Sequence, residues 1–178
     1  MASRTLQIGP QRYRESIGRY YADFRVGDIY EHRPGRTITE ADNIWFSLLT
    51  MNQHPLHSDN VYGAATQFGR PLVNSCLTLA IVTGMTVADF SHKAVANLGW
   101  DKVKLVAPVF VGDTIYAESE VIETRESRSR AHHGIVTVRT TGRWADGTVF
   151  ITFERSALLP MQGHAAEEQD QGTGLRHV

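Results

Sequence analysis

Cysteine is nearly missing from this 178-residue chain, which contains only Cys76. An intrachain disulfide is therefore impossible, which excludes the small disulfide-stapled domains of oxidising compartments. A single thiol that opens an apolar run is more typical of a small buried hydrophobe than of a nucleophile. We interpret Cys76 as a core residue and expect a reducing, cytoplasmic location.

The chain also lacks a strong charge of either sign, because 18 basic and 19 acidic residues give a formal net charge of −1. No global field would attract nucleic acid or an anionic membrane. The longest apolar stretch is interrupted by threonine and glycine and is too short to cross a bilayer. The first twenty residues are polar and arginine-rich, unlike a secretory signal. We expect neither nucleic acid nor membrane among the partners.

Two short helices are predicted in the first half of the chain. Thr39 is a suitable N-cap ahead of acidic residues in the first turn, where the helix dipole favours negative charge. Ile44, Trp45, Leu48 and Leu49 would give this helix an apolar face. It should end before His54-Pro55, because a residue that precedes proline avoids helical backbone angles. Ser58-Asp59 offers a second cap for a short helix through Ala65.

The segment after Gly69-Arg70-Pro71 predicts the architecture. Its apolar residues cover both sides of a helix, and a helix that is apolar nearly all round must be buried. In a chain of this length, the remaining elements have to wrap it. The two sides consist of Leu77, Ala80, Ile81, Gly84, Met85 and Ala88, and of Leu79, Val82, Val87 and Phe90.

The second half supplies the wrapper as a series of strands. Residues 149–154 alternate in the period-two pattern of a half-buried strand, and Asp146-Gly147 is a strong hairpin signal. Gly112-Asp113 and a polar loop over 125–133 mark the other turns, and such short connections require antiparallel pairing. The predicted strands cover 29–37, with a break at Pro34-Gly35, and 95–106, 113–126, 134–144 and 148–159.

One buried helix followed by a meander that curls around it predicts an α+β fold of the hot-dog type over residues 22–160. Residues 1–21 have no clear periodicity and are interpreted as an irregular N-terminal arm. Residues 161–178, rich in Gly, Gln, Glu and Asp, are interpreted as a disordered tail. Because the sheet has open edges that invite pairing, we expect a homodimer or higher homo-oligomer with joined sheets, or a second subunit of the same fold.

The chemistry-bearing residues lie between the two short helices, in the run Asn-Gln-His-Pro-Leu-His over 52–57. His57 can exchange a proton near neutral pH, as general acid–base catalysis requires. Asn52 can orient a water or a carbonyl, but its amide does not titrate. On spacing alone, a solvated loop histidine is the more frequent explanation.

Residues 46–57 resemble the hydratase motif of the MaoC-like, (R)-specific enoyl-CoA hydratases. That motif runs aromatic, small, hydrophobic, small, Gly, Asp, any residue, Asn, Pro, aliphatic, His. The resemblance continues through residues 68–73 and 108–114, and covers about 26–160. It implies a hot-dog fold, an acyl-CoA thioester as substrate, and no metal or redox cofactor.

Carried over from the resemblance, the catalytic histidine is His57. The backbone N–H that supports the thioester oxygen falls at Ser75, next to Asn74, where the start of the central helix suits developing negative charge. The family's catalytic Asp is Asn52 here, the usual Gly is Met51, and the usual Asn is His54. The loss of a carboxylate removes one base.

Residues 49–52, 73–75 and 97–101 resemble the mesaconyl-CoA hydratase (β-methylmalyl-CoA dehydratase) branch, which implies a branched, carboxylated acyl-CoA. We hypothesise that His57 is the principal acid–base and that Asn52 holds the water or the leaving hydroxyl. Arg70 and Asn74 are candidate substrate-binding residues, Arg70 for the additional carboxylate. A structural role of Arg70, bridging the loop to the helix, is an equal alternative.

Two other functions stay open at this point. Hot-dog domains also serve as acyl-CoA thioesterases, in which Asn52 and His57 would direct water to the thioester carbonyl. A non-catalytic module that binds an acyl group would bind thioesters without turnover. Release of free CoA separates hydrolysis from hydration, since only hydrolysis frees the thiol.

Overall fold

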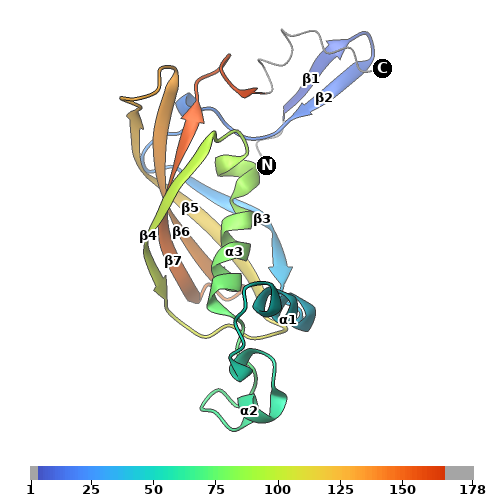
Figure 1. Cartoon of the computed structure of the whole chain (residues 1–178). Coiled ribbons are helices and arrows are strands. Elements are labelled where there is room, and N and C mark those ends of the chain that lie inside the picture. Colours follow the sequence, from blue (N-terminus) through green and yellow to red (C-terminus); the bar gives the residue numbers. More distant parts are fainter. Residues whose placement is uncertain (1–3, 167–178) are drawn as a thin grey trace.

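A five-stranded antiparallel sheet curves around helix α3 (Ser75–Met85) in the computed structural model, which describes residues 4–166 (Figure 1). The predicted strands are therefore confirmed, each to within one or two residues at its ends. In spatial order the strands are β3 (Ile29–Thr37), β5 (Thr114–Glu126), β6 (His133–Trp144), β7 (Val149–Pro160) and β4 (Ala96–Leu105).

The predicted meander is correct for β5, β6 and β7 and wrong for β4. Strand β4 pairs antiparallel with β7 at one edge of the sheet, whereas β5 lies between β3 and β6. The Gly112-Asp113 turn therefore does not close a hairpin. The Asp113 carboxylate instead accepts hydrogen bonds from the Phe110 N–H at 3.0 Å and the Trp144 indole N–H at 3.1 Å. These contacts direct the chain from the β4 edge into the sheet.

Helices α1 (Glu40–Leu49) and α2 (Asn60–Ala64) and the 3-10 helix η2 (Pro55–His57) lie at the N-terminal end of α3 (Figure 1). The predicted caps are confirmed. The Thr39 hydroxyl accepts from the Asp42 N–H at 3.2 Å, and the Asp59 carboxylate accepts from the N–H groups of Val61 and Tyr62.

Helix α1 does not pack against the rest of the protein with the apolar face that we predict. Trp45, Leu48 and Leu49 are 65%, 67% and 79% exposed, whereas Asn43 and Ser47 are buried. The apolar periodicity indicates a helix correctly but does not orient it. The orientation follows from the hydrogen bonds of Asn43, described below.

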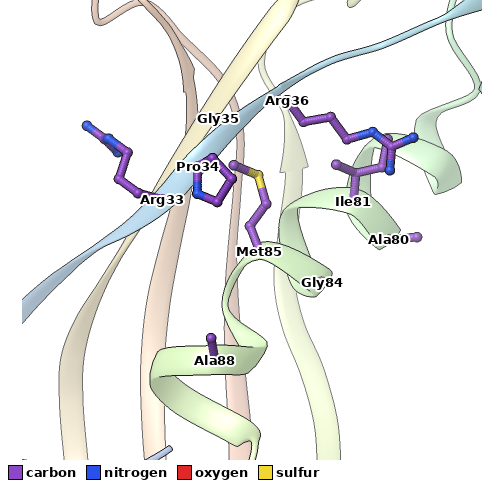
Figure 2. A pocket seen from close by; sticks show the side chains of 9 residues that line it. All are labelled: Arg33, Pro34, Gly35, Arg36, Ala80, Ile81, Gly84, Met85 and Ala88. Atoms are coloured by element: carbon purple, nitrogen blue, oxygen red, sulfur yellow. The ribbon is translucent and has the colours of Figure 1, made fainter. Parts of the chain in front are cut away.

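Helix α3 is enclosed on one side only. Leu77, Thr78 and Val82 are buried against the sheet, but Cys76 is exposed, which corrects its interpretation as a core residue. The open side of α3 and strand β3 border a groove of about 660 Å³ (Figure 2). Its lining residues are Arg33, Pro34, Gly35, Arg36, Ala80, Ile81, Gly84, Met85 and Ala88. After α3 the chain continues into the π-helix η3 (Val87–Ser91).

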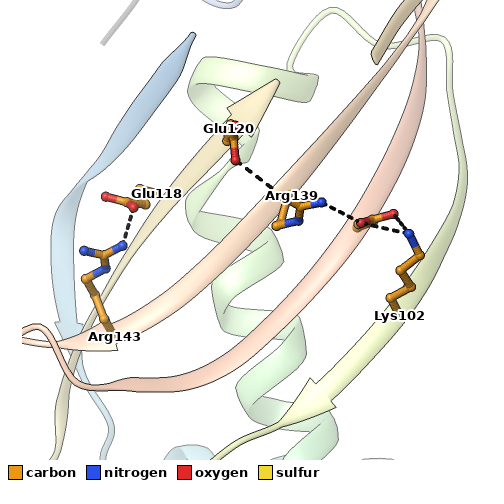
Figure 3. A network of polar contacts seen from close by, with 6 residues as sticks. Lys102, Glu118, Glu120, Arg139 and Arg143 are labelled. Atoms are coloured by element: carbon orange, nitrogen blue, oxygen red, sulfur yellow. Dashed lines mark hydrogen bonds and ion pairs between the residues drawn. The ribbon is translucent and has the colours of Figure 1, made fainter. Parts of the chain in front are cut away.

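The outer face of the sheet carries a network of charged side chains (Figure 3). Arg139 lies 3.6 Å from Glu120 and 3.2 Å from Glu154, and Lys102 lies 3.0 Å from Glu154. On the inner face, buried apolar residues of β5, β6 and β7 form two clusters, against α3 and against Phe24 and Phe90. This alternation places the core between sheet and helix.

The predicted irregular arm is wrong for residues 4–16, which form the two-stranded hairpin β1 (Arg4–Gly9) and β2 (Arg12–Ser16), followed by the 3-10 helix η1 (Tyr21–Asp23). The hairpin stands at the opposite end of the molecule from α1 and α2 (Figure 1).

Beyond β7, the His164 ring stacks on His132 with a centroid distance of 4.0 Å. The rest of the expected tail, 167–178, lies outside the described residues, as do residues 1–3. No helix between residues 4 and 166 has the length and apolar character that crossing a bilayer requires.

A series of hydrogen-bonded polar side chains runs through the core beneath η3. The His32 ring is fully buried; its Nδ1 lies 3.2 Å from the Asp89 carboxylate and its Nε2 lies 2.8 Å from the Ser119 hydroxyl. Ser119 in turn lies 2.8 Å from the Thr140 hydroxyl. Burial lowers the pKa of His32 more strongly than the Asp89 carboxylate raises it.

The lowered pKa predicts acid sensitivity. Below pH 6.5 the unfolded chain takes up the proton that the folded His32 resists, so stability is present above this pH and lost as the pH falls. We expect the free energy of unfolding to drop by up to about 1 kcal/mol from this residue between pH 7.5 and 5.5. Urea denaturation of wild type and His32→Gln at both pH values measures it. Equal pH-dependent losses in the two proteins would contradict the prediction.

Candidate active site

A single buried side chain, that of Asn43 on α1, joins the three segments that carry the candidate residues. Its Nδ2 donates to the His57 carbonyl at 2.8 Å and to the Leu72 carbonyl at 3.2 Å, and its Oδ1 accepts from the Asn74 N–H at 2.8 Å. Sequence reasoning missed Asn43. The available signal was its place inside a helix, where asparagine is unfavourable unless its amide has partners elsewhere.

His57 is held in one defined tautomer. Its Nδ1 lies 2.9 Å from the Leu72 carbonyl oxygen. Because a carbonyl oxygen only accepts hydrogen bonds, Nδ1 carries a proton, and in the neutral ring Nε2 therefore has the free lone pair. The ring is half-buried at the end of η2. This arrangement provides an oriented proton acceptor, which a general base requires.

Asn52 follows α1 in a tight turn. Its N–H donates to the Ser47 carbonyl at 2.9 Å, and its side-chain Oδ1 accepts from the His54 N–H at 3.2 Å. The preceding Met51 has a φ of +58°, the left-handed conformation that favours glycine. Methionine therefore adopts a left-handed backbone conformation at the position where the hydratase motif has glycine, at a cost of about 1 kcal/mol.

Four of the predicted site residues, His57, Arg70, Asn52 and Ser75, line three separate hollows. His57 and Arg70 line a cavity of about 240 Å³, and Asn52 lines a neighbouring one of about 300 Å³. The two cavities share Ile44 and Ser58 as lining residues. One chain therefore brings His57 and Asn52 close together, but not into a single cavity.

The start of α3 contributes Asn74 and Ser75. The Asn74 side chain is buried and caps the helix, since its Oδ1 accepts from the Cys76 N–H at 3.0 Å. Ser75 is half-buried and lines the third hollow, a mostly apolar cavity of about 240 Å³ that also includes Leu72 and Thr78. Asn74 thus shapes the helix N-terminus, and Ser75 borders this apolar hollow.

Arg70 stands at the rim of the His57 cavity without a carboxylate partner among the described residues. Its guanidinium carbon lies 4.0 Å from the centre of the Phe110 ring, a cation–π contact that fixes the side chain. Gly63 of α2 packs on the backbone behind it, where an added Cβ would lie 2.6 Å from the Pro71 nitrogen. The positive charge is therefore positioned and available to an anion.

The comparisons with known proteins agree with this architecture. The family model described as "MaoC like domain" matches residues 23–143. Mesaconyl-CoA hydratase of Cereibacter sphaeroides is 32% identical over 151 residues, which cover 85% of this chain and 44% of that protein. Beta-methylmalyl-CoA dehydratase of Chloroflexus aurantiacus is 34% identical over 125 residues, 70% of this chain and 35% of that protein. The chain spans less than half the length of these relatives.

Solved structures share the fold. A protein of Chloroflexus aurantiacus described as a MaoC domain dehydratase superposes with a TM-score of 0.77 at 31% identity, covering 82% of this chain and 41% of that chain. A Mycobacterium tuberculosis protein described as a double hot-dog fold superposes with a TM-score of 0.75 at 24% identity, covering 83% and 46%. The hot-dog prediction is confirmed, and the family match extends over more than half of the sequence. The chain belongs to the MaoC-like domain family.

Proposed function

We propose that this protein catalyses the reversible hydration and dehydration of a 2-enoyl-CoA thioester, with His57 as the acid–base. The observation that carries the proposal is the hydrogen bond from His57 Nδ1 to the Leu72 carbonyl, which leaves Nε2 as a free proton acceptor. The relatives named as mesaconyl-CoA hydratase and beta-methylmalyl-CoA dehydratase support the reaction class.

In the hydration direction, His57 Nε2 takes a proton from water as the water oxygen bonds to C3 of the substrate. The π electrons move towards C2 and the thioester oxygen, which the N-terminus of α3 at Ser75 stabilises through its free N–H groups and dipole. The protonated imidazole then returns the proton to C2. Dehydration follows the same steps in reverse. His57 is the only protein group that changes its protonation state during the reaction, and it ends in the state in which it began.

Asn52 and Arg70 serve binding in this proposal. The Asn52 Oδ1 already accepts from the His54 N–H, so its Nδ2 is the group that holds the water or hydroxyl oxygen. The cation of Arg70, held over Phe110, pairs with the additional carboxylate of a branched, mesaconyl-CoA-like substrate. Asn74 acts through the helix N-terminus that it caps.

We further propose that the working form is a homodimer or a higher homo-oligomer, located in the cytoplasm. Strand β4 is an edge of the sheet and exposes apolar side chains, among them Leu98, Trp100 and Val103 at 50%, 46% and 43%. Such an edge invites pairing with a second sheet. A second copy would also enclose hollows that one chain leaves open.

Replacement of His57 tests the reaction. We expect His57→Ala to lower the hydration rate of mesaconyl-CoA and crotonyl-CoA by about 10²- to 10⁴-fold, because the proton acceptor is lost. Loss of the enoyl-thioester absorbance measures hydration, and a thiol reagent reports any free CoA. His133→Ala, at the first residue of β6, is the control. Near wild-type activity in His57→Ala would end the proposal, and release of thiol by wild type would favour a thioesterase.

Replacement of Asn52 tests the binding role. Loss of one hydrogen bond to the reacting oxygen costs about 1.4 kcal/mol, so Asn52→Ala should lower kcat about tenfold. Gln53→Ala, at the exposed neighbouring position, should leave kcat unchanged. A kcat for Asn52→Ala equal to that of Gln53→Ala would show that Asn52 only shapes the turn.

Replacement in β4 tests the assembly. Val103→Asp places a charge on the exposed edge and should shift the protein towards monomer, with a loss of activity if the partner completes the site. Val26→Asp, at a 62% exposed turn position, is the matched control. Light scattering coupled to size exclusion measures the mass. A monomeric wild type would contradict this part of the proposal.

A further inference from the structure

His54 is the second imidazole of the candidate site and has so far only a structural role. It stands at the N-cap of η2, where its Nδ1 accepts from the Leu56 N–H at 3.1 Å. Its ring centre lies 6.0 Å from that of His57, with the planes tilted by 57°. The Tyr62 ring also contacts the His54 ring edge-on, with centres 5.9 Å apart.

The two imidazoles are held in opposite tautomers. Because His54 Nδ1 accepts a backbone N–H, it has no proton, and the neutral ring must carry its proton on Nε2. His57 carries its proton on Nδ1, which faces the Leu72 carbonyl, so its Nε2 is bare. The backbone thus prepares one hydrogen-bond donor and one acceptor in neighbouring rings.

We infer that His54 is a further catalytic residue that donates a hydrogen bond from Nε2–H to the same oxygen atom that His57 deprotonates. The inference rests on the proposed hydration reaction. With ring centres 6.0 Å apart, one oxygen atom at about 2.8 Å from a nitrogen of each ring bridges the two imidazoles when those nitrogens turn toward each other. A water between them donates to His57 and accepts from His54, which fixes the direction of its lone pairs.

The proton balance distinguishes the two histidines. In hydration, His57 takes the proton of water and later gives it to C2, while His54 keeps its own proton throughout. In dehydration, the C3–O bond breaks as His57 protonates the leaving hydroxyl, and the donor of His54 stabilises the charge that develops on that oxygen. His54 cannot serve as a second base, since its remaining lone pair is used by the Leu56 N–H.

The sequence departures from the hydratase motif fit this arrangement. Where the motif has Asp and Asn, this chain has Asn52 and His54, and the Asn52 Oδ1 accepts the His54 N–H at 3.2 Å. An asparagine at position 54 would cap η2 as well as histidine does. The imidazole also carries an N–H donor that reaches farther from the backbone than the amide of asparagine. This additional donor explains why position 54 is histidine although the shorter asparagine would be sufficient as a cap.

Nitrogen chemical shifts test the tautomers without any activity. In the full-length protein at pH 8, ¹⁵N-labelled histidine should show a protonated Nε2 for His54 and a protonated Nδ1 for His57. Single His→Asn variants assign the signals. A His54 protonated at Nδ1, or a mixture of both tautomers, would overturn the inference while leaving the proposed reaction intact.

His54→Asn tests the donor in the reaction, since the amide oxygen retains the cap. We expect kcat for mesaconyl-CoA to fall about 10- to 100-fold with the melting temperature unchanged, and His132→Asn to behave as wild type. Asn52→Asp combined with His54→Asn re-creates the motif pair and should recover part of the loss on crotonyl-CoA. Unchanged kcat in His54→Asn would reduce His54 to a cap. If wild type hydrates neither thioester, it is the proposed function that fails.

Discussion

The placement of the candidate site depends on one fully satisfied amide, the side chain of Asn43. Its two N–H bonds go to the His57 and Leu72 carbonyls, and its oxygen accepts the Asn74 N–H. The Leu72 carbonyl uses its second lone pair for His57 Nδ1. The bond that selects the His57 tautomer and the bonds that dock α1 therefore share an atom, so the reactive ring cannot be positioned independently of the helix packing. Buried polar networks with every group paired rigidify a site in this way.

Features set by local sequence were predictable, and features set by distant contacts were not. The caps at Thr39 and Asp59 and the ends of the strands follow from neighbours in the chain, and the sequence predicted them closely. The position of β4 beside β7 depends on pairing across more than forty residues, and periodicity carries no information about it. The outward turn of Trp45 likewise results from the long-range bonds of Asn43, which an apolar pattern cannot reveal.

Buried polar residues show the same limit. Arg155 on β7 is 4% exposed, its guanidinium lies 4.8 Å from the centre of the Phe90 ring, and its Nε and Nη2 lack hydrogen-bond partners among the described residues. Burial lowers the pKa of this residue to about 10. In the sequence, Arg155 occupies an ordinary position of an alternating strand. A charge is so seldom buried that no pattern would place this one in the core, and the family resemblance, which points to His57 as a candidate, gives no indication of it.

The resemblance to the hydratase motif points to the residues of the candidate site, but the cavities of one chain do not join around those residues. Loop residues 52–57 are fixed by backbone hydrogen bonds, so His57 and Asn52 are already oriented, yet the hollows that these two residues line are separate. Orientation is thus encoded within the chain, whereas enclosure is not. The open side of α3 is likewise not enclosed within one chain. Cys76, Ala80 and Gly84 on that side are small, so their exposure leaves little apolar area in water. The side chains of the candidate site are thus oriented by one chain, and the second hot-dog unit of the proposed assembly is what would exclude water around them.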